Sequence, residues 1–173
     1  QYDLIPVNLK DAGGAFIQEE ITKDPELYNT LLTYQEKGQQ ELGVVIGSTD
    51  GVLDGERANV RNKQTNLGRL ITTATAEKLS TDFGIVNSGG VRASIAAGDI
   101  CYRDVLTVHP FGNTVNKATI TGSELAAYLG RVATKTIAPG GYHQFGGINM
   151  AVDCQAKRVT ITSVGGSACD RRR

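Results

Sequence analysis

Residues 83–92, Phe83-Gly84-Ile85-Val86-Asn87-Ser88-Gly89-Gly90-Val91-Arg92, set the architecture expected for this 173-residue chain. A short apolar run that ends in a polar, glycine-rich loop is typical of a buried strand with a ligand-binding loop at its end. Glycines let backbone N–H groups approach an anion, and Arg92 offers a guanidinium suited to phosphate or carboxylate. Taken alone, these residues are also compatible with a tight turn that binds nothing.

Helices and strands alternate on both sides of this loop. Apolar periodicity and capping signals predict strands at 44–47, 83–86 and 115–120, helices at 66–80, 102–108 and 121–133, and a final strand pair at 147–152 and 158–162. Asn66 is the expected N-cap of the helix at 66–80, and Thr121-Gly122-Ser123-Glu124 is a capping-box signature at the start of the helix at 121–133. This order predicts an α/β (α+β layered) domain, with a mixed sheet flanked by helices.

A separate helix precedes this domain. Asp24-Pro25-Glu26 supplies an N-cap acceptor, a proline at the first helical position and an acid that complements the helix dipole. We expect a helix over 25–43 and a domain boundary at its end, with residues 44–173 as the main domain. Residues 1–24 contain a strand-like run at 4–9 but too little apolar sequence to fold alone.

Composition limits the functional classes. Hydrophobic residues make up 40% and charged residues 21%, as in ordinary globular proteins, and no apolar run is long enough for a membrane span. The net charge is zero, but residues 44–173 carry fifteen basic and ten acidic residues, which suits a small anionic ligand. No basic stripe interleaved with aromatic residues is present, so nucleic acid is not expected as a partner.

Three cysteines, Cys101, Cys154 and Cys169, lack the C-x-x-C spacing of structural zinc sites. Cys101 lies in an apolar context that favours a buried thiol. Cys154 and Cys169 flank the final strand pair, and the sequence leaves open whether they form a disulfide or remain two thiols.

Two more segments hold candidate binding residues. Arg57 and Arg61 lie four residues apart, either as two solvated side chains or with an anion between them. The loop His109-Pro110-Phe111-Gly112-Asn113 presents an aromatic ring that either stacks on a base or covers a helix end.

Residues with catalytic signatures are not evident. His109 and His143 are the only histidines, and neither belongs to a metal-ligand spacing. The chain also contains no G-x-S-x-G motif and no P-loop. We therefore expect no catalytic residue, no metal site and no cofactor in this chain.

Four motifs in order resemble the C-terminal, substrate-binding domain of the 5′-nucleotidase family, particularly its bacterial periplasmic members that hydrolyse UDP-sugars and 5′-nucleotides. They are Asn66-Leu67-Gly68-Arg69-Leu70-Ile71, Asn87-Ser88-Gly89-Gly90-Val91-Arg92-Ala93-Ser94-Ile95, Gly98-Asp99-Ile100 and Val108-His109-Pro110-Phe111-Gly112-Asn113. The resemblance extends over nearly the whole chain.

This resemblance implies a two-domain enzyme in which an N-terminal metallophosphoesterase domain holds two divalent metal ions. Residues 1–24 would then be the tail of that domain, 25–43 the connecting helix, and 44–173 an incomplete substrate-binding domain. The implied ligands are nucleotides or nucleosides (AMP, adenosine, UDP-sugars), and the implied location is periplasmic or secreted. The substrate-binding residues implied by the motifs are Arg57, Arg61, Asn87, Gly89, Gly90, Arg92, Phe111 and Asn113.

Two departures from the family pattern qualify these expectations. Ser88 stands where the family's loop has the first of three glycines. The family also continues, past the position of Arg173, to a second aromatic residue that closes on the base. We therefore expect weak nucleotide binding and no hydrolysis by this chain alone. The alternative is a secreted, non-catalytic nucleoside-binding or interaction module.

Overall fold

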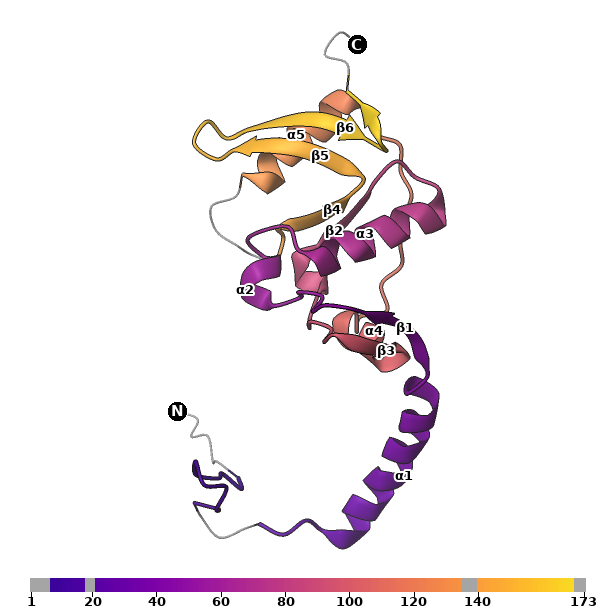
Figure 1. Ribbon diagram of the computed structural model, residues 1–173, viewed down its shortest axis with the longest axis vertical. Coiled ribbons are helices and arrows are strands. Elements are labelled where there is room, and N and C mark those ends of the chain that lie inside the picture. The colour runs from indigo at the N-terminus through magenta and orange to yellow at the C-terminus, as the bar shows by residue number, and fades with distance from the viewer. Residues whose placement is uncertain (1–6, 18–20, 135–139, 170–173) are drawn as a thin grey trace. The chain divides into compact units, whose positions relative to one another are not determined.

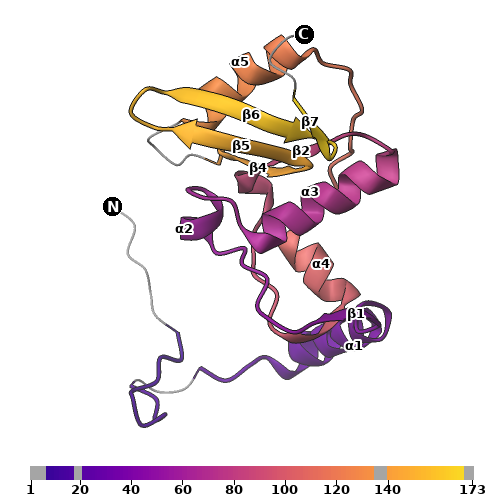
Figure 2. The same ribbon diagram turned by 45° about the horizontal axis from the view of Figure 1, so that its top comes forward.

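The computed structural model describes residues 7–17, 21–134 and 140–169, and the chain divides into two compact units, residues 1–43 and 44–173. Figures 1 and 2 show the ribbon from two directions.

The first unit contains helix α1 (Pro25–Leu42), as the sequence predicts. The Oδ1 atom of Asp24 accepts hydrogen bonds from the N–H groups of Glu26 and Leu27, both at 3.0 Å, so the cap forms as expected. The predicted strand-like run at 4–9 is described only from Val7 on, and residues 7–9 form no strand. None of the α1 residues is buried, so the described part of this unit has no core of its own.

The second unit is a layered α/β domain, which confirms the predicted class. Its helices are α2 (Arg57–Val60), α3 (Asn66–Leu79), α4 (Tyr102–Val108) and α5 (Gly122–Ala133). Its strands are β1 (Val45–Thr49), β2 (Gly84–Asn87), β3 (Gly98–Cys101), β4 (His143–Gly146), β5 (Ile148–Asp153), β6 (Arg158–Val164) and β7 (Ser167–Ala168).

The described strands pair antiparallel in three small sheets, with orders β1-β3, β2-β4 and β5-β6-β7. Helix α3 packs on the β2–β4 pair, and α5 packs on β6. Figure 2 shows the resulting layers, with the strands between α3 and α5.

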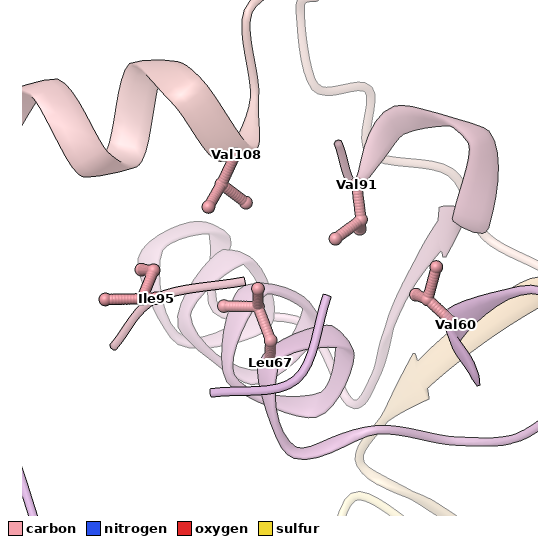
Figure 3. Packing of buried hydrophobic residues seen from close by; sticks show 5 residues of the cluster. All are labelled: Val60, Leu67, Val91, Ile95 and Val108. Carbon is pink, nitrogen blue, oxygen red and sulfur yellow. The ribbon is translucent and has the colours of Figure 1, made fainter. Parts of the chain in front are cut away.

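Two apolar clusters hold these layers together. The first joins Val60, Leu67, Val91, Ile95 and Val108, which come from four segments of the chain and converge in Figure 3. The second packs Leu125, Leu129 and Val132 of α5 against Phe145 of β4 and partly buried residues of β5 and β6. The segment that joins β2 to α4 belongs to the first cluster, so the loop after β2 rests on a packed base.

Glycines set the distance between α3 and the β2–β4 pair. A Cβ atom on Gly68 would collide with the side chain of Gln144, and one on Gly84 would collide with the backbone carbonyl of Thr72. Main chain therefore packs directly on main chain or on a buried side chain at these two positions. We call this contact the glycine seam.

The N-cap of α3 differs from the prediction. Thr65, not Asn66, caps the helix, because its Oγ1 accepts the N–H of Gly68 at 3.1 Å. Asn66 is the first helical residue, and its side chain instead binds the preceding loop: Oδ1 accepts the N–H of Asp54 and Nδ2 donates to the carbonyl of Val52.

The predicted strand at 115–120 is wrong. Those residues are exposed and belong to neither a helix nor a strand, while the flanking helices α4 and α5 form as predicted. A strand exists only where a second strand pairs with it, and among the described residues none pairs with this segment.

The cysteines are free thiols in this structure. Cys154 lies in the turn that joins Asp153 to Arg158, whereas the N–H of Cys169 bonds the carbonyl of Thr162, four residues further along β6. Four strand residues span about 13 Å, which exceeds the Cα separation of a disulfide. Cys101 is half-buried at the end of β3 rather than fully buried.

Candidate functional site

The loop after β2 is fixed by hydrogen bonds to the segment that precedes β4. Residues Ser88–Gly90 form one 3₁₀ turn. The N–H of Gly89 donates to the carbonyl of Gly140 at 2.9 Å, and the N–H of Ser88 donates to that of Tyr142 at 2.7 Å. The Nδ2 of Asn87 and the hydroxyl of Ser88 also reach the Gly140 carbonyl, each at 3.4 Å. The loop therefore has a defined shape before any ligand arrives.

Gly89 lies close to Gly140, and a side chain there would be tightly packed. A Cβ atom on Gly89 would lie 3.1 Å from the carbonyl oxygen and 3.2 Å from the Cα of Gly140. Ser88, which replaces the family's first glycine, is fully buried and lies in the 3₁₀ turn. The serine is therefore accommodated without disturbing the turn.

Arg61 reaches this loop from α2. A Cβ atom on Gly140 would lie 3.8 Å from the Cζ of Arg61, so the guanidinium lies beside the segment that holds the loop. Its Nε is buried and has no hydrogen-bond acceptor in the part of the chain that the structure describes. A buried guanidinium N–H without an acceptor is costly, and an anion or carbonyl brought by a ligand would satisfy it.

A buried glutamine holds Arg61 in place. Gln144 of β4 is fully buried, and its Nε2 donates to the carbonyls of Val60 and Lys63, both at 2.7 Å. Its Oε1 accepts the N–H of Thr65 at 2.9 Å. Since these three partners flank Arg61 in sequence, Gln144 fixes the backbone from which the guanidinium extends.

Gln64 extends the same clamp along β4. Its Nε2 donates to the carbonyl of His143 at 2.7 Å, and its Oε1 accepts the N–H of Phe145 at 2.8 Å. The sequence analysis missed both glutamines. The sequence held no signal for Gln144, because alternation places it on the face opposite Phe145, and only the structure shows that both faces of β4 are buried.

Arg92 and Phe111 lie together at the open side of the loop. The Nη1 of Arg92 donates to the carbonyl of Gly89 at 3.3 Å, and its Cζ lies 5.6 Å from the centroid of the Phe111 ring. The Phe111 side chain is 55% exposed. The loop, a cation and an exposed aromatic face are thus adjacent.

Two predicted site residues are not joined to this cluster. Arg57 is the first residue of α2 and is exposed, and Asn113 lies in the exposed segment after Phe111. Among the described residues, neither side chain makes a hydrogen bond or ion pair with the loop. Contacts in the structure link Arg61, Asn87, Gly89, Gly90, Arg92 and Phe111 to the loop or to the segment that holds it.

His109 packs against the glycine-rich loop at Gly90. Its Cε1 lies 3.5 Å from the position of a Cβ on Gly90, so the imidazole packs on the glycine backbone. Its Nε2 is buried without a hydrogen-bond partner among the described residues. Burial lowers the pKa of His109 below its ordinary value, because the protonated ring would lose hydration.

We expect His109 to make the domain less stable in mild acid. Because its pKa is lower when folded, the unfolded chain takes up the proton first, so stability falls as the pH drops below about 6.5 and levels off below the folded pKa. Urea unfolding at about pH 7.5 and about pH 5.5 measures this loss. The His109→Gln variant should lose less over that interval, whereas an equal loss would assign the effect to other groups.

Two cavities have linings that do not include the loop after β2. One, of about 440 Å³, is lined mainly by residues 79–85 and 115–120. Another, of about 860 Å³, is lined by residues 62–66 and by β5 residues. Neither of these two cavities is lined by Asn87, Arg92 or Phe111. We favour the loop after β2 over the cavities because two arginines and an exposed aromatic ring lie next to it.

The described residues, 7–17, 21–134 and 140–169, contain neither a metal-binding cluster nor a membrane-spanning helix. No group of three or more His, Cys, Asp or Glu side chains suited to a metal ion occurs among them. No helix there is long and apolar enough to cross a membrane.

Comparison with known proteins shows which family this chain resembles. Residues 45–172 match the family model described as 5′-nucleotidase, C-terminal domain. A 5′-nucleotidase of Vibrio parahaemolyticus is 51% identical over 88% of this chain and 28% of its own length. Protein UshA of Yersinia enterocolitica is 42% identical over 98% of this chain and 32% of its own.

A solved structure is similar as well. The crystal structure of a 5′-nucleotidase precursor from Thermus thermophilus matches with a TM-score of 0.64 and 29% identity, over 90% of this chain and 34% of that one. The chain thus spans about a third of the length of the relatives that it matches.

Proposed function

We propose that this chain, which belongs to the family of 5′-nucleotidase C-terminal domains, recognises nucleotides and nucleosides such as AMP, adenosine and UDP-sugars. In the parent protein, we infer, recognition serves the hydrolysis of nucleotide phosphate esters by another domain. The chain itself then contributes binding and orientation of the substrate rather than chemistry.

The contact of Arg92 with both Gly89 and Phe111 carries this proposal. The exposed ring offers a face on which a nucleobase can stack, an interaction of about 1–3 kcal/mol. The guanidinium beside it is suited to the phosphate or ribose side of the same ligand. A base-stacking surface and a cation at this spacing match the two ends of a nucleotide.

The remaining residues complete the proposed ligand contacts. The buried Nε of Arg61 lacks an acceptor among the described residues, and a ligand oxygen would supply one. Asn87 and the backbone of Gly89 and Gly90 form the floor of the loop. Arg57 and Asn113 are exposed, and we assign them the outermost contacts.

Divalent metal ions belong to the parent protein's other domain in this proposal. The described residues of this chain do not fit them, because no cluster of suitable side chains is present there. A metal site on the parent's N-terminal domain would supply the activated water, and the present residues would only hold the nucleotide. We therefore expect no release of phosphate from AMP by the purified chain.

The proposed place of this chain in its parent follows from the family. Residues 1–24 would end the metallophosphoesterase domain, 25–43 would connect it to residues 44–173, and the protein would be periplasmic or secreted. The clear division of the chain after Gly43 supports this organisation.

A two-dimensional NMR titration of the chain with adenosine and AMP tests the proposal. We expect saturable shifts at residues 87–92 and Phe111, with AMP adding shifts at Arg61 and Arg92. Shifts confined to other regions, or none, would contradict nucleotide recognition at this loop and would favour an interaction module. Buffer alone serves as the blank. Cytosine serves as the control for a base that stacks weakly.

A further inference from the structure

The two arginines nearest the glycine-rich loop come from separate segments of the chain. Arg61 caps the C-terminal end of α2, and residues 53–55 lead into that helix. Arg92 is followed directly by residues 93–95. Residues 53–55 and 93–95 lie side by side, and we call their contact the α2 brace. Because each half of the brace adjoins one arginine, its geometry bears on the distance between the two guanidinium groups.

Backbone contacts hold the two halves of the brace together. The N–H of Leu53 donates to the carbonyl of Ile95 at 2.9 Å, and the N–H of Ile95 donates back to the carbonyl of Leu53 at 3.0 Å. At Gly55 a Cβ atom would overlap the carbonyl oxygen of Ala93, so main chain packs directly on main chain there. The two segments are therefore as close as their backbones allow.

Ser94 adds a side-chain hydrogen bond across the brace. Its Oγ accepts the N–H of Gly55 at 2.9 Å. Gly55 is buried, whereas Ser94 is exposed, so the hydroxyl reaches from the surface to a buried donor. A buried N–H that loses its acceptor is costly. Without the hydroxyl, the brace would therefore open at Gly55 to let another acceptor reach that N–H.

Asp54 connects the brace to α2. Its Oδ1 accepts the N–H of Glu56 at 3.0 Å, and its Oδ2 accepts the Nδ2 of Asn59 at 2.9 Å. Helix α2 has only four residues, and the side chain of its N-cap residue, Glu56, makes no capping hydrogen bond. A helix this short depends on support from outside. A shift of Gly55 is thus carried through Asp54 into α2 and to Arg61 at its end.

The Arg92 side of the site is fixed by other contacts. The N–H of Arg92 donates to the carbonyl of Val108 at 3.0 Å, and the guanidinium lies over the ring of Phe111. Neither contact passes through Ser94. Loss of the Ser94 hydrogen bond should therefore displace Arg61 relative to Arg92 and leave Arg92 and Phe111 together.

We propose that Ser94 is a positioning residue that sets the spacing between Arg61 and Arg92, and that it thereby favours nucleotides over nucleosides. The inference rests on the function proposed above. A phosphate that meets both guanidinium groups requires them at one spacing. A base stacked on Phe111 requires only the ring and its contact with Arg92. Ser94 therefore acts on the phosphate of the ligand and not on its base.

NMR titrations of Ser94 variants with AMP and adenosine test this inference. Ser94→Ala should bind AMP about fivefold more weakly than the unaltered chain, as expected for about one hydrogen bond, and should bind adenosine within about twofold. Ser94→Thr keeps the hydroxyl and should restore the AMP affinity. Ser48→Ala is the matched control, because Ser48 of β1 is exposed and its side chain makes no hydrogen bond among the described residues.

The amide signal of Gly55 gives a second readout in the same spectra. It should shift in Ser94→Ala and stay near its original position in Ser94→Thr. Unchanged AMP binding by Ser94→Ala overturns this inference alone. Equal losses of AMP and adenosine affinity also overturn it, because they would assign Ser94 a general structural role. Failure of the unaltered chain to bind either ligand would overturn the proposed function and this inference with it.

Discussion

Replacing Gln144 with alanine is expected to lower the free energy of unfolding of residues 44–173 by about 3 kcal/mol. The fully buried amide makes three hydrogen bonds of 2.7–2.9 Å to backbone groups of Val60, Lys63 and Thr65. Alanine would leave these backbone groups buried without partners and would open a cavity beneath α3. The melting temperature should fall by about 10 °C, measurable by calorimetry or thermal circular dichroism.

Two further variants separate the amide's hydrogen bonds from general effects of the substitution. Gln35→Ala, on an exposed face of α1, should change stability by less than about 0.5 kcal/mol. Gln144→Glu keeps the shape but turns an acceptor toward the carbonyls of Val60 and Lys63, so it should be strongly destabilised at neutral pH and partly recover in acid. A loss below about 1 kcal/mol for the alanine variant would refute the clamp.

Replacing Phe111 with alanine is expected to weaken adenosine binding by about 1–3 kcal/mol, a loss of about 5–150-fold in affinity. The side chain is 55% exposed, so its removal should change stability little. The loss arises because the stacking face disappears and the guanidinium of Arg92, 5.6 Å from the ring centroid, loses its support. NMR or calorimetric titration gives the affinity directly.

Phe111→Tyr is the matched control, because it keeps the ring and the contact with Arg92. Its affinity should stay within a few-fold of the original. Phe16→Ala, an exposed phenylalanine in the first unit, controls for loss of a surface ring elsewhere. Unchanged binding by the Phe111→Ala variant would exclude stacking on this ring.

Elements with local signals could be predicted from the sequence. The cap at Asp24 and the capping box at Thr121 and Glu124 involve residues two or three apart, and both form as expected. The strand predicted at 115–120 failed because pairing is not local: β-branched residues favour a strand, but only a neighbouring strand completes it. The cap of α3 moved by one residue because Asn66 is engaged by Val52 and Asp54.

The candidate site also contains some residues that local sequence could identify and others whose position depends on distant contacts. Asn87, Gly89, Gly90 and Arg92 are close in sequence, so their shared loop could be recognised directly. The position of Arg61 depends on Gln144, more than eighty residues away in sequence, and no local pattern reveals that contact. Arg57 and Arg61 lie at the two ends of α2, and their spacing left open whether they hold an anion; only the resemblance to the family implied a binding role for Arg57.

The glycine seam also bears on how this domain can change over evolutionary time. At Gly68 and Gly84 there is no room for an added methyl group. The short distance between α3 and the sheet therefore depends on the absence of a side chain at both positions. At Gly68 a larger residue is tolerated only if Gln144 becomes smaller or moves, whereas at Gly84 the obstacle is the main chain of Thr72, which no change of side chain removes. Position 68 should therefore covary with position 144 among homologues, and replacement of Gly84 should be rare.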